Sequence, residues 1–313
     1  MNVSVAHHVE AALVDALFAI ARRGKVAQTR AFCERVGVFA HAMGLRRRVA
    51  EENLAFAFPE KSDAERAAIL LEHYRELGRV AGEYARLPEL VHAPPGETIA
   101  RIDGVEGLEA LRGKGALLLS GHFGSFELVG AALARFNPVD FIVKPLSNTL
   151  VEKRIERLRR DAGLGLVPTG PGVRAVFRTL RAGRWVGILA DQDARRHGVF
   201  VPFFGRLAST PEGPARLALA TGAAIVIGTD HRESDGRHVI RLDPPYFPEG
   251  PLDDANVLRL TAWHTAALEQ RIRESPASWF WLHRRWKSVK VDAASEPSEL
   301  SEPSEPPARG AVT

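Results

Sequence analysis

Short apolar runs alternate with segments of helical periodicity from Ile99 onward, and this alternation constrains the fold more than any other feature of the chain. The apolar runs predict strands, at 116–119, 139–143, 185–190, 223–228 and 238–242, the last with one exposed face. The intervening segments predict helices, at 127–135, 150–161, 173–180, 214–221 and 253–274. Strands and helices in this order predict an α/β fold, with a mixed, largely parallel sheet flanked by helices.

The segments on either side of this alternation have different patterns. Residues 1–92 have helical periodicity, and Pro94-Pro95-Gly96 ends that region. Within it, Ser62 and Glu65 have the spacing of a capping box, so a helix is expected to begin there. The residues after Val291 are acidic and rich in proline and serine, which is typical of disorder. We therefore expect a helical N-terminal region (1–95), an α/β core (96–291) and a disordered acidic tail (292–313).

Charge is unevenly distributed along the chain. The whole chain has a net charge of +4 and the tail has −4, so residues 1–291 have a net charge of +8. A basic body suits an anionic partner such as a phospholipid surface or an acidic carrier protein. Nucleic acid is disfavoured because the basic residues are dispersed and no nucleic-acid-binding motif is present. Cys33 is the only cysteine, which excludes an internal disulfide and a cysteine-based metal cluster.

The first predicted helix has an apolar face followed by a basic cluster. Its apolar run, Ala11–Ala21, is interrupted by Asp15 and is too short to span a bilayer, which takes about 20 residues. The face and the cluster suit a helix lying in a membrane interface, and equally a helix packed on its own domain. The face contains Val9, Leu13, Ala16, Leu17 and Ile20, and the cluster contains Arg22, Arg23 and Lys25.

The predicted junction between strand 116–119 and the next helix contains a candidate base and a candidate acid, His122 and Glu127. In one regular helix the two would point about 140° apart, since each residue turns about 100°. With His122 in a turn and Glu127 in the first helical turn, and with Gly121 and Gly124 allowing a sharp path, Glu127 is expected to accept a hydrogen bond from the imidazole. A core histidine bonded to backbone groups is the alternative interpretation. A serine hydrolase is disfavoured because Glu127 replaces the last glycine of a G-x-S-x-G elbow around Ser125.

The motif Ser-Gly-His-Phe-Gly-Ser-Phe-Glu at 120–127 resembles the signature of the bacterial lipid A late acyltransferases, within the wider class of H-x4-D/E acyltransferases. Three further blocks resemble that family in the same order. They are 144–157, 191–213 and 276–287. The resemblance as a whole runs from roughly residue 45 to 290.

This resemblance implies roles for individual residues. His122 and Glu127 would form the catalytic dyad. Residues of the second and third blocks would bind substrate, namely Lys144, Asn148, Arg157, Asp191, Gln192, Gly205 and Thr210. The neighbouring Arg154, Arg159 and Arg160 are expected to be solvated helix charges.

The resemblance also implies a reaction, which is transfer of a fatty acyl chain from acyl carrier protein to a hydroxyl of a lipid A precursor. The reaction would take place at the cytoplasmic face of the bacterial inner membrane. No metal or cofactor is expected. Two alternatives stay open: the same chemistry on another glycolipid, such as a mannosylated phosphatidylinositol, or a non-catalytic lipid-binding relative.

The last block contains Trp279, Trp281 and His283 at alternate positions. As a strand, this segment would place the three side chains on one face. A packed edge strand is favoured slightly over a membrane-facing one. His283 is a poor candidate for a second base because no carboxylate lies near it in the sequence.

Overall fold

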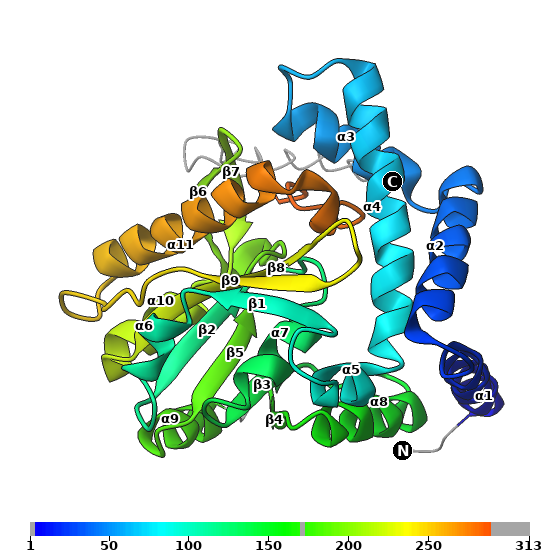
Figure 1. Ribbon diagram of the computed structural model, residues 1–313. Helices are drawn as coiled ribbons and strands as arrows, with labels where there is room; N and C mark the ends of the chain where they lie inside the picture. Colours follow the sequence, from blue (N-terminus) through cyan, green and yellow to red (C-terminus); the bar gives the residue numbers. More distant parts are fainter. Residues whose placement is uncertain (1–3, 170–172, 289–313) are drawn as a thin grey trace, which may run out of the picture.

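The computed structural model describes residues 4–169 and 173–288 (Figure 1). The tail that is predicted to be disordered, 292–313, lies outside the described residues. Within the described parts, no helix has the length and hydropathy needed to cross a membrane.

A seven-stranded sheet, in the order β1-β9-β8-β2-β5-β3-β4, forms the centre of the molecule. All neighbouring strands are parallel except β8 and β9, so the predicted mixed, largely parallel sheet is confirmed. The strands are β1 (Ile99–Asp103), β2 (Ala116–Ser120), β3 (Val139–Val143), β4 (Gly165–Pro168), β5 (Trp185–Leu189), β8 (Ala224–Arg232) and β9 (His238–Leu242). β9 lies between β1 and β8 and is mostly buried, so the predicted exposed face of 238–242 is wrong.

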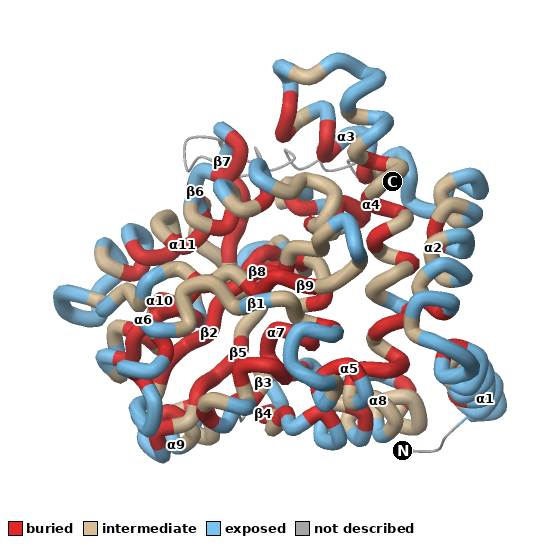
Figure 2. Tube along the Cα trace, in the orientation of Figure 1, coloured by how far each residue is buried: buried red, intermediate tan, exposed pale blue. Residues whose placement is uncertain are grey.

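Alternate side chains of the buried strands enter separate cores on the two faces of the sheet. In β2, Leu118 packs with α5 (Leu87–His92), α6 (Val105–Glu109), α7 (Phe126–Leu133) and α8 (Thr149–Asp161). Its neighbour Leu117 packs with α9 (Val173–Arg181), α10 (Gly213–Thr221) and α11 (Asp254–Glu274). Side chains two residues apart on a strand share a face, so the continuous apolar runs reflect burial on both sides. Figure 2 shows these strands largely in red.

Four helices precede α5 and the sheet along the chain. They are α1 (Val5–Ala21), α2 (Val26–Ala42), α3 (Arg47–Ala57) and α4 (Asp63–Tyr84). The capping box predicted at the start of α4 is confirmed, because Ser62 and Glu65 bond each other's backbone N–H groups. α4 stands between the sheet and the outer helices α1 and α2 (Figure 1).

An aromatic cluster covers the carboxyl ends of the central strands. It joins α3 and α4 to the antiparallel hairpin β6 (Val199–Phe203) and β7 (Arg206–Thr210), and to the segment after the turn η2 (Pro276–Ser278). The short turn η1 (Arg195–His197) precedes this hairpin. The strand predicted around Trp279 is wrong: this segment makes one isolated bridge, to Phe123, and then turns. Trp279 and Trp281 are both buried, with their ring centroids 4.6 Å apart.

Candidate active site

His122 lies in the turn that joins the end of β2 to α7. Backbone hydrogen bonds hold this turn to the segment after α11: the Gly124 N–H donates to Ser278 O at 2.9 Å, and the Phe280 N–H donates to His122 O at 3.0 Å. Gly124 has a φ of +52°, a conformation that glycine adopts without strain. Any Cβ at Gly121 would lie 2.8 Å from a carboxylate oxygen of Asp191. Both glycines are therefore required, one for the path of the turn and one for the close approach of Asp191.

Asp191 is the carboxylate that orients His122. Its Oδ1 is 2.8 Å from His122 Nδ1, while its Oδ2 accepts the His122 backbone N–H at 2.7 Å and the Trp279 indole N–H at 2.8 Å. Burial alone would raise the pKa of Asp191, but the hydrogen bonds and charge of His122 hold it below its ordinary value. Asp191 is therefore an ionised acceptor, which places the imidazole proton on Nδ1 and leaves a lone pair on Nε2.

The electrostatic balance at His122 favours a base of increased strength. Burial lowers the pKa of the imidazole, but the hydrogen bond and charge of Asp191, with a smaller contribution from the charge of Glu127, more than offset this effect. The pKa of His122 therefore lies above its ordinary value. Nε2 lies 3.3 Å from the side-chain nitrogen of Gln192, which is exposed.

The hydrogen bond predicted between Glu127 and His122 is wrong. Glu127 lies in the first turn of α7, as predicted, but both of its carboxylate oxygens are bonded to Arg159 of α8, the shortest contact being 2.6 Å. Burial raises the pKa of Glu127 even though Arg159 opposes this shift. Glu127 therefore links α7 to α8 through its ion pair with Arg159. Its role in catalysis stays a prediction.

An apolar cavity of about 370 Å³ opens beside His122. It runs between α7, α8 and the carboxyl-terminal halves of β2, β3 and β5. Phe126, Val129, Gly130 and Leu133 of α7 line it at the spacing of one helical face. At the inner end the Phe141 ring fits between Gly130 and Gly187, where any Cβ would come within 2.4 Å of the ring. A histidine beside a largely hydrocarbon-lined pocket can act on a polar group attached to a long apolar chain.

Only some of the predicted substrate-binding residues of the second block, 144–157, line this cavity. Lys144 lines its mouth and is exposed. Asn148 is buried, caps α8 through Leu150 N and Val151 N, and donates to His7 O and Glu10 Oε2 of α1. Its amide is thus fully engaged within the fold, and the predicted contact with substrate is not supported. Arg157 is exposed on α8 and lies outside the cavity lining.

The predictions of substrate contact for residues of the third block, 191–213, differ in how well the structure supports them. Gln192 lies next to His122 Nε2, which suits its predicted contact with substrate. Gly205, with a φ of +75°, forms the tip of the β6–β7 hairpin and does not line the cavity. Thr210 is fully buried and its hydroxyl accepts a 2.6 Å hydrogen bond from Arg285. Its predicted contact with substrate is therefore not supported, because the side chain is buried and already bonded.

Two residues that the sequence left aside belong to the site. Arg159 was expected to be solvated, yet it pairs with Glu127 and lines the cavity. Trp279 was expected on an edge strand, yet it bonds Asp191. Its place in the Trp-x-Trp run at 279–281 was a signal of burial, but no pattern predicted its contact with Asp191. His283 accepts the Asp193 backbone N–H and so has a structural role. Among the described residues, no group of three or more potential metal ligands lies together.

This chain is similar to known acyltransferases. The family model for bacterial lipid A biosynthesis acyltransferases matches residues 7–288. The lipid A biosynthesis palmitoleoyltransferase of Escherichia coli is 28% identical over 83% of this chain and 85% of its own length. The lipid A biosynthesis lauroyltransferase of the same organism is 30% identical over 79% of this chain and 80% of its own length.

A relative with a different acceptor is also similar. The phosphatidylinositol mannoside acyltransferase of Mycolicibacterium smegmatis is 30% identical over 65% of this chain and 67% of its own length. All three relatives are acyltransferases by name, and this chain is an acyltransferase too. Because the family model covers nearly the whole chain, the protein belongs to the bacterial lipid A biosynthesis acyltransferase family.

Proposed function

We propose that this enzyme transfers a fatty acyl chain from the thioester of acyl carrier protein to a hydroxyl of a lipid A precursor. The observation that carries the proposal is the His122–Asp191 pair at the mouth of the apolar cavity. The cavity would hold the donor chain and place its thioester carbonyl beside Nε2. The basic body, +8 over residues 1–291, suits an acidic carrier protein.

The proposed transfer takes place in one ternary complex, with His122 as general base. Nε2 removes the proton of the acceptor hydroxyl while its oxygen attacks the thioester carbonyl carbon. The carbon–oxygen bond of the new ester forms, the carbon–sulfur bond breaks, and the thiolate leaves with the proton returned by the imidazolium. Asp191 stabilises that imidazolium and keeps the ring in the required tautomer.

Replacement of the base tests this mechanism. We expect His122→Ala to reduce the transfer rate roughly 10²–10⁴-fold, the usual contribution of a general base. The measurement uses acyl carrier protein charged with a labelled acyl chain and a tetra-acylated lipid A precursor bearing its sugar acid. His197→Ala, at an exposed histidine of η1, is the matched control and should transfer at the wild-type rate. Unchanged turnover in His122→Ala would exclude the mechanism.

The same assay decides between acceptors and donors. Similarity to the phosphatidylinositol mannoside acyltransferase favours a second candidate, in which the chemistry is kept and the acceptor is a mannosylated phosphatidylinositol. Transfer to that lipid, with none to the lipid A precursor, would select it. Replacing acyl carrier protein by coenzyme A as donor tests the carrier. A non-catalytic relative would transfer to neither acceptor.

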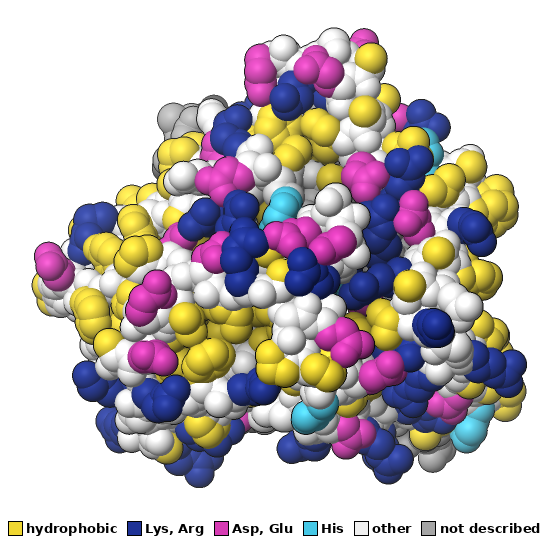
Figure 3. Space-filling model, viewed as in Figure 1, with side chains coloured by type: hydrophobic (Ala, Val, Ile, Leu, Met, Phe, Trp, Pro, Cys, Tyr) yellow, Lys and Arg dark blue, Asp and Glu magenta, His cyan; other side chains and the backbone are white. Residues whose placement is uncertain are grey.

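Two exposed apolar stripes support attachment to a membrane surface. Leu13 and Leu17 of α1 are 60% and 63% exposed, and Phe39 of α2 and Met43, which follows the end of α2, are 65% and 69% exposed. The stripes consist of Val5, Val9, Leu13, Leu17 and Ile20 on α1, and of Phe32, Val36 and Phe39 on α2 with Met43 after it. Figure 3 shows yellow side chains with dark blue ones among them along the edge formed by α1 and α2. A mixture of exposed apolar and cationic side chains suits an anionic lipid surface.

The cavity lies close to this edge. α8 contributes Ile155 and Arg159 to the cavity wall and is tied to α1 by an Arg154–Asp15 ion pair at 2.5 Å. A lipid substrate could therefore reach His122 from the surface on which α1 lies. We propose that the enzyme acts at the cytoplasmic face of the bacterial inner membrane, and these contacts support its attachment at the membrane interface.

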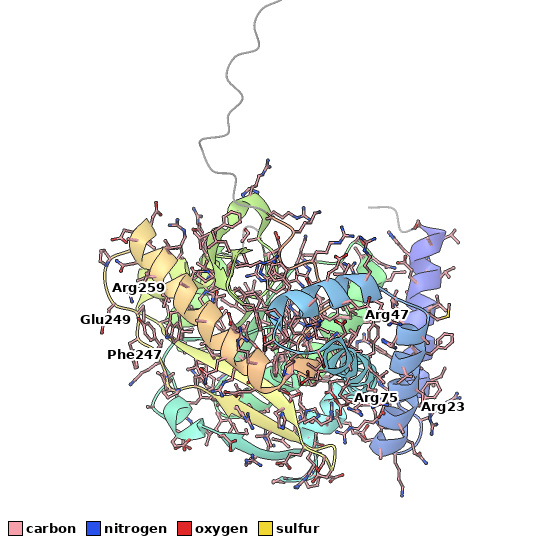
Figure 4. The ribbon with its side chains drawn as sticks, turned by 90° about the horizontal axis from the view of Figure 1, so that it is seen from above. Arg23, Arg47, Arg75, Phe247, Glu249 and Arg259 are labelled. Carbon is pink, nitrogen blue, oxygen red and sulfur yellow. The ribbon has the colours of Figure 1, made fainter. Side chains whose placement is uncertain are left out.

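Substitutions in the α1 stripe test the attachment. We expect Leu13→Glu with Leu17→Glu to reduce binding to phosphatidylethanolamine–phosphatidylglycerol vesicles at least about tenfold, because each buried leucine contributes about 1.5–3 kcal/mol. Vesicle sedimentation measures the bound fraction. Phe247→Glu with Leu252→Glu is the control: both side chains are also exposed, and Figure 4 places Phe247 at the opposite edge from Arg23. Equal losses in both double variants would contradict a specific α1 surface.

A further inference from the structure

The turn that carries His122 is held from both sides by carboxylates of the neighbouring strands. β2 lies between β5 and β8 in the sheet and is parallel to both. On one side Asp191, beyond the end of β5, accepts the His122 backbone N–H. On the other side Asp230 of β8 accepts the Ser125 backbone N–H at 2.8 Å. The two ends of the turn are thus fixed by two different strands.

The position of Asp230 in the sheet directs its carboxylate to this turn. Leu119 of β2 pairs with Ile227 of β8, and His122 and Asp230 each follow three residues later. Any Cβ at Gly124 would lie 2.6 Å from Oδ2 of Asp230. The carboxylate therefore packs directly against the backbone of the turn, and only glycine leaves room for it there.

Asp230 is itself fixed by a buried ionic network. It is 1% exposed, and its oxygens lie 2.8 and 3.0 Å from Nδ1 of His238 on β9. Nε2 of His238 lies 3.2 Å from Glu83 of α4, and Glu83 is also paired with Arg232 of β8. Burial lowers the pKa of His238, but the charges of Asp230 and Glu83 and the hydrogen bonds to them raise it to about 9. His238 is therefore a cation at neutral pH and donates to both carboxylates.

We propose that Asp230 is a positioning residue for acyl transfer, which fixes the turn so that the imidazole of His122 faces the apolar cavity. The inference rests on the proposed role of His122 and adds a second anchor to it. A buried backbone N–H that loses its acceptor is costly, so the turn would shift if residue 230 were apolar. A displacement of about 1 Å at a catalytic group can reduce the rate about 100-fold. The competing explanation is that the network only holds β8 and β9 to α4.

Asp230→Leu tests the inference, because leucine has a similar shape and no acceptor. We expect kcat to fall roughly 10–100-fold and the KM of the lipid A precursor to change less than about twofold, since the substrate-binding surfaces stay in place. Asp230→Asn should recover most of kcat, because its amide oxygen can accept the Ser125 N–H. Asp140→Leu is the matched control. Asp140 is also buried and is paired with Arg184, but it lies near the amino end of β3, so this variant should lose stability and keep its kcat.

A double variant separates positioning from folding. Asp230→Leu leaves the His238 cation with one carboxylate fewer, and the further change His238→Leu removes that cation. The double variant should therefore unfold at a higher urea concentration than Asp230→Leu, yet show the same loss of kcat. It also serves as the test variant if Asp230→Leu does not fold.

The outcomes distinguish this inference from the function on which it rests. An unchanged kcat in Asp230→Leu, or its recovery in the double variant, would overturn the inference alone, because the network would then be structural only. An equal loss of kcat in Asp140→Leu would do the same, since the loss would then report on the stability of the fold. Unchanged turnover in His122→Ala would overturn the proposed mechanism and the inference together.

Discussion

Asp191→Asn is expected to reduce the transfer rate roughly 10²–10⁴-fold, close to the loss caused by removing the base itself. The carboxylate bonds His122 Nδ1 and so fixes the tautomer in which Nε2 is free to accept a proton. An amide in its place can turn its NH₂ group toward Nδ1, which favours the other tautomer and puts a hydrogen on Nε2. Single-turnover rates with saturating donor and acceptor measure the effect on the chemical step.

The pH profile distinguishes positioning from a general loss of structure. His122 must be neutral to act as a base, so activity should rise with pH through its pKa, which Asp191 holds above the ordinary value. Without the carboxylate this pKa falls, and the acidic limb of the profile should move to lower pH. Glu127→Gln should move that limb less, because the charge of Glu127 makes a smaller contribution to the raised pKa than Asp191 does. A shift in Glu127→Gln with none in Asp191→Asn would restore Glu127 as the orienting acid.

The pairing of His122 with Asp191 shows that spacing along the sequence does not identify a contact between neighbouring strands. The histidine and the carboxylate five residues later suggested a local pair, but the actual partner is 69 residues away. Strands β2 and β5 are parallel neighbours with Ser120 opposite Leu189, so His122 and Asp191 each follow two residues beyond the paired ends. Strand order depends on contacts between distant segments, and the local spacing of residues along the chain does not reveal it. The sequence therefore identified both residues as belonging to the site, but not their contact.

The fold was predictable where burial leaves a simple pattern. The strands β2, β3 and β5 are buried members of the sheet, and their apolar runs gave their positions within one residue. β6 escaped notice because Pro202 interrupts its run, and a proline fits only a strand with a free edge, as in this two-stranded hairpin. The segment around Trp279 was wrongly predicted as a strand because its pattern resembles one. Its alternating tryptophans imitate a strand, yet both pack into one aromatic cluster from a turn.

Arg159→Met is expected to lower the free energy of unfolding by about 3–5 kcal/mol at neutral pH, because it leaves the buried Glu127 carboxylate without its partner. Arg160→Met, one residue further along α8 and exposed, should cost well under 1 kcal/mol and is the matched control. Urea denaturation of the two variants and the wild type measures both values. Equal costs in the two variants would show that the Glu127–Arg159 pair does not hold α7 to α8.

The stability loss in Arg159→Met should depend on pH, because it comes from the ionised form of Glu127. Burial already raises the pKa of Glu127, and loss of Arg159 raises it further, so the folded variant holds this proton more tightly than the unfolded chain. The loss of stability relative to the wild type should therefore be absent below the pKa of Glu127 in the unfolded chain. It should be complete above the pKa of Glu127 in the folded variant. Glu127→Leu with Arg159→Met should recover much of the lost stability, since an apolar pair removes both desolvated charges. If the refolded double variant transfers acyl chains at a near-normal rate, Glu127 is a structural residue; a loss above about 100-fold would show that it also acts on catalysis through His122.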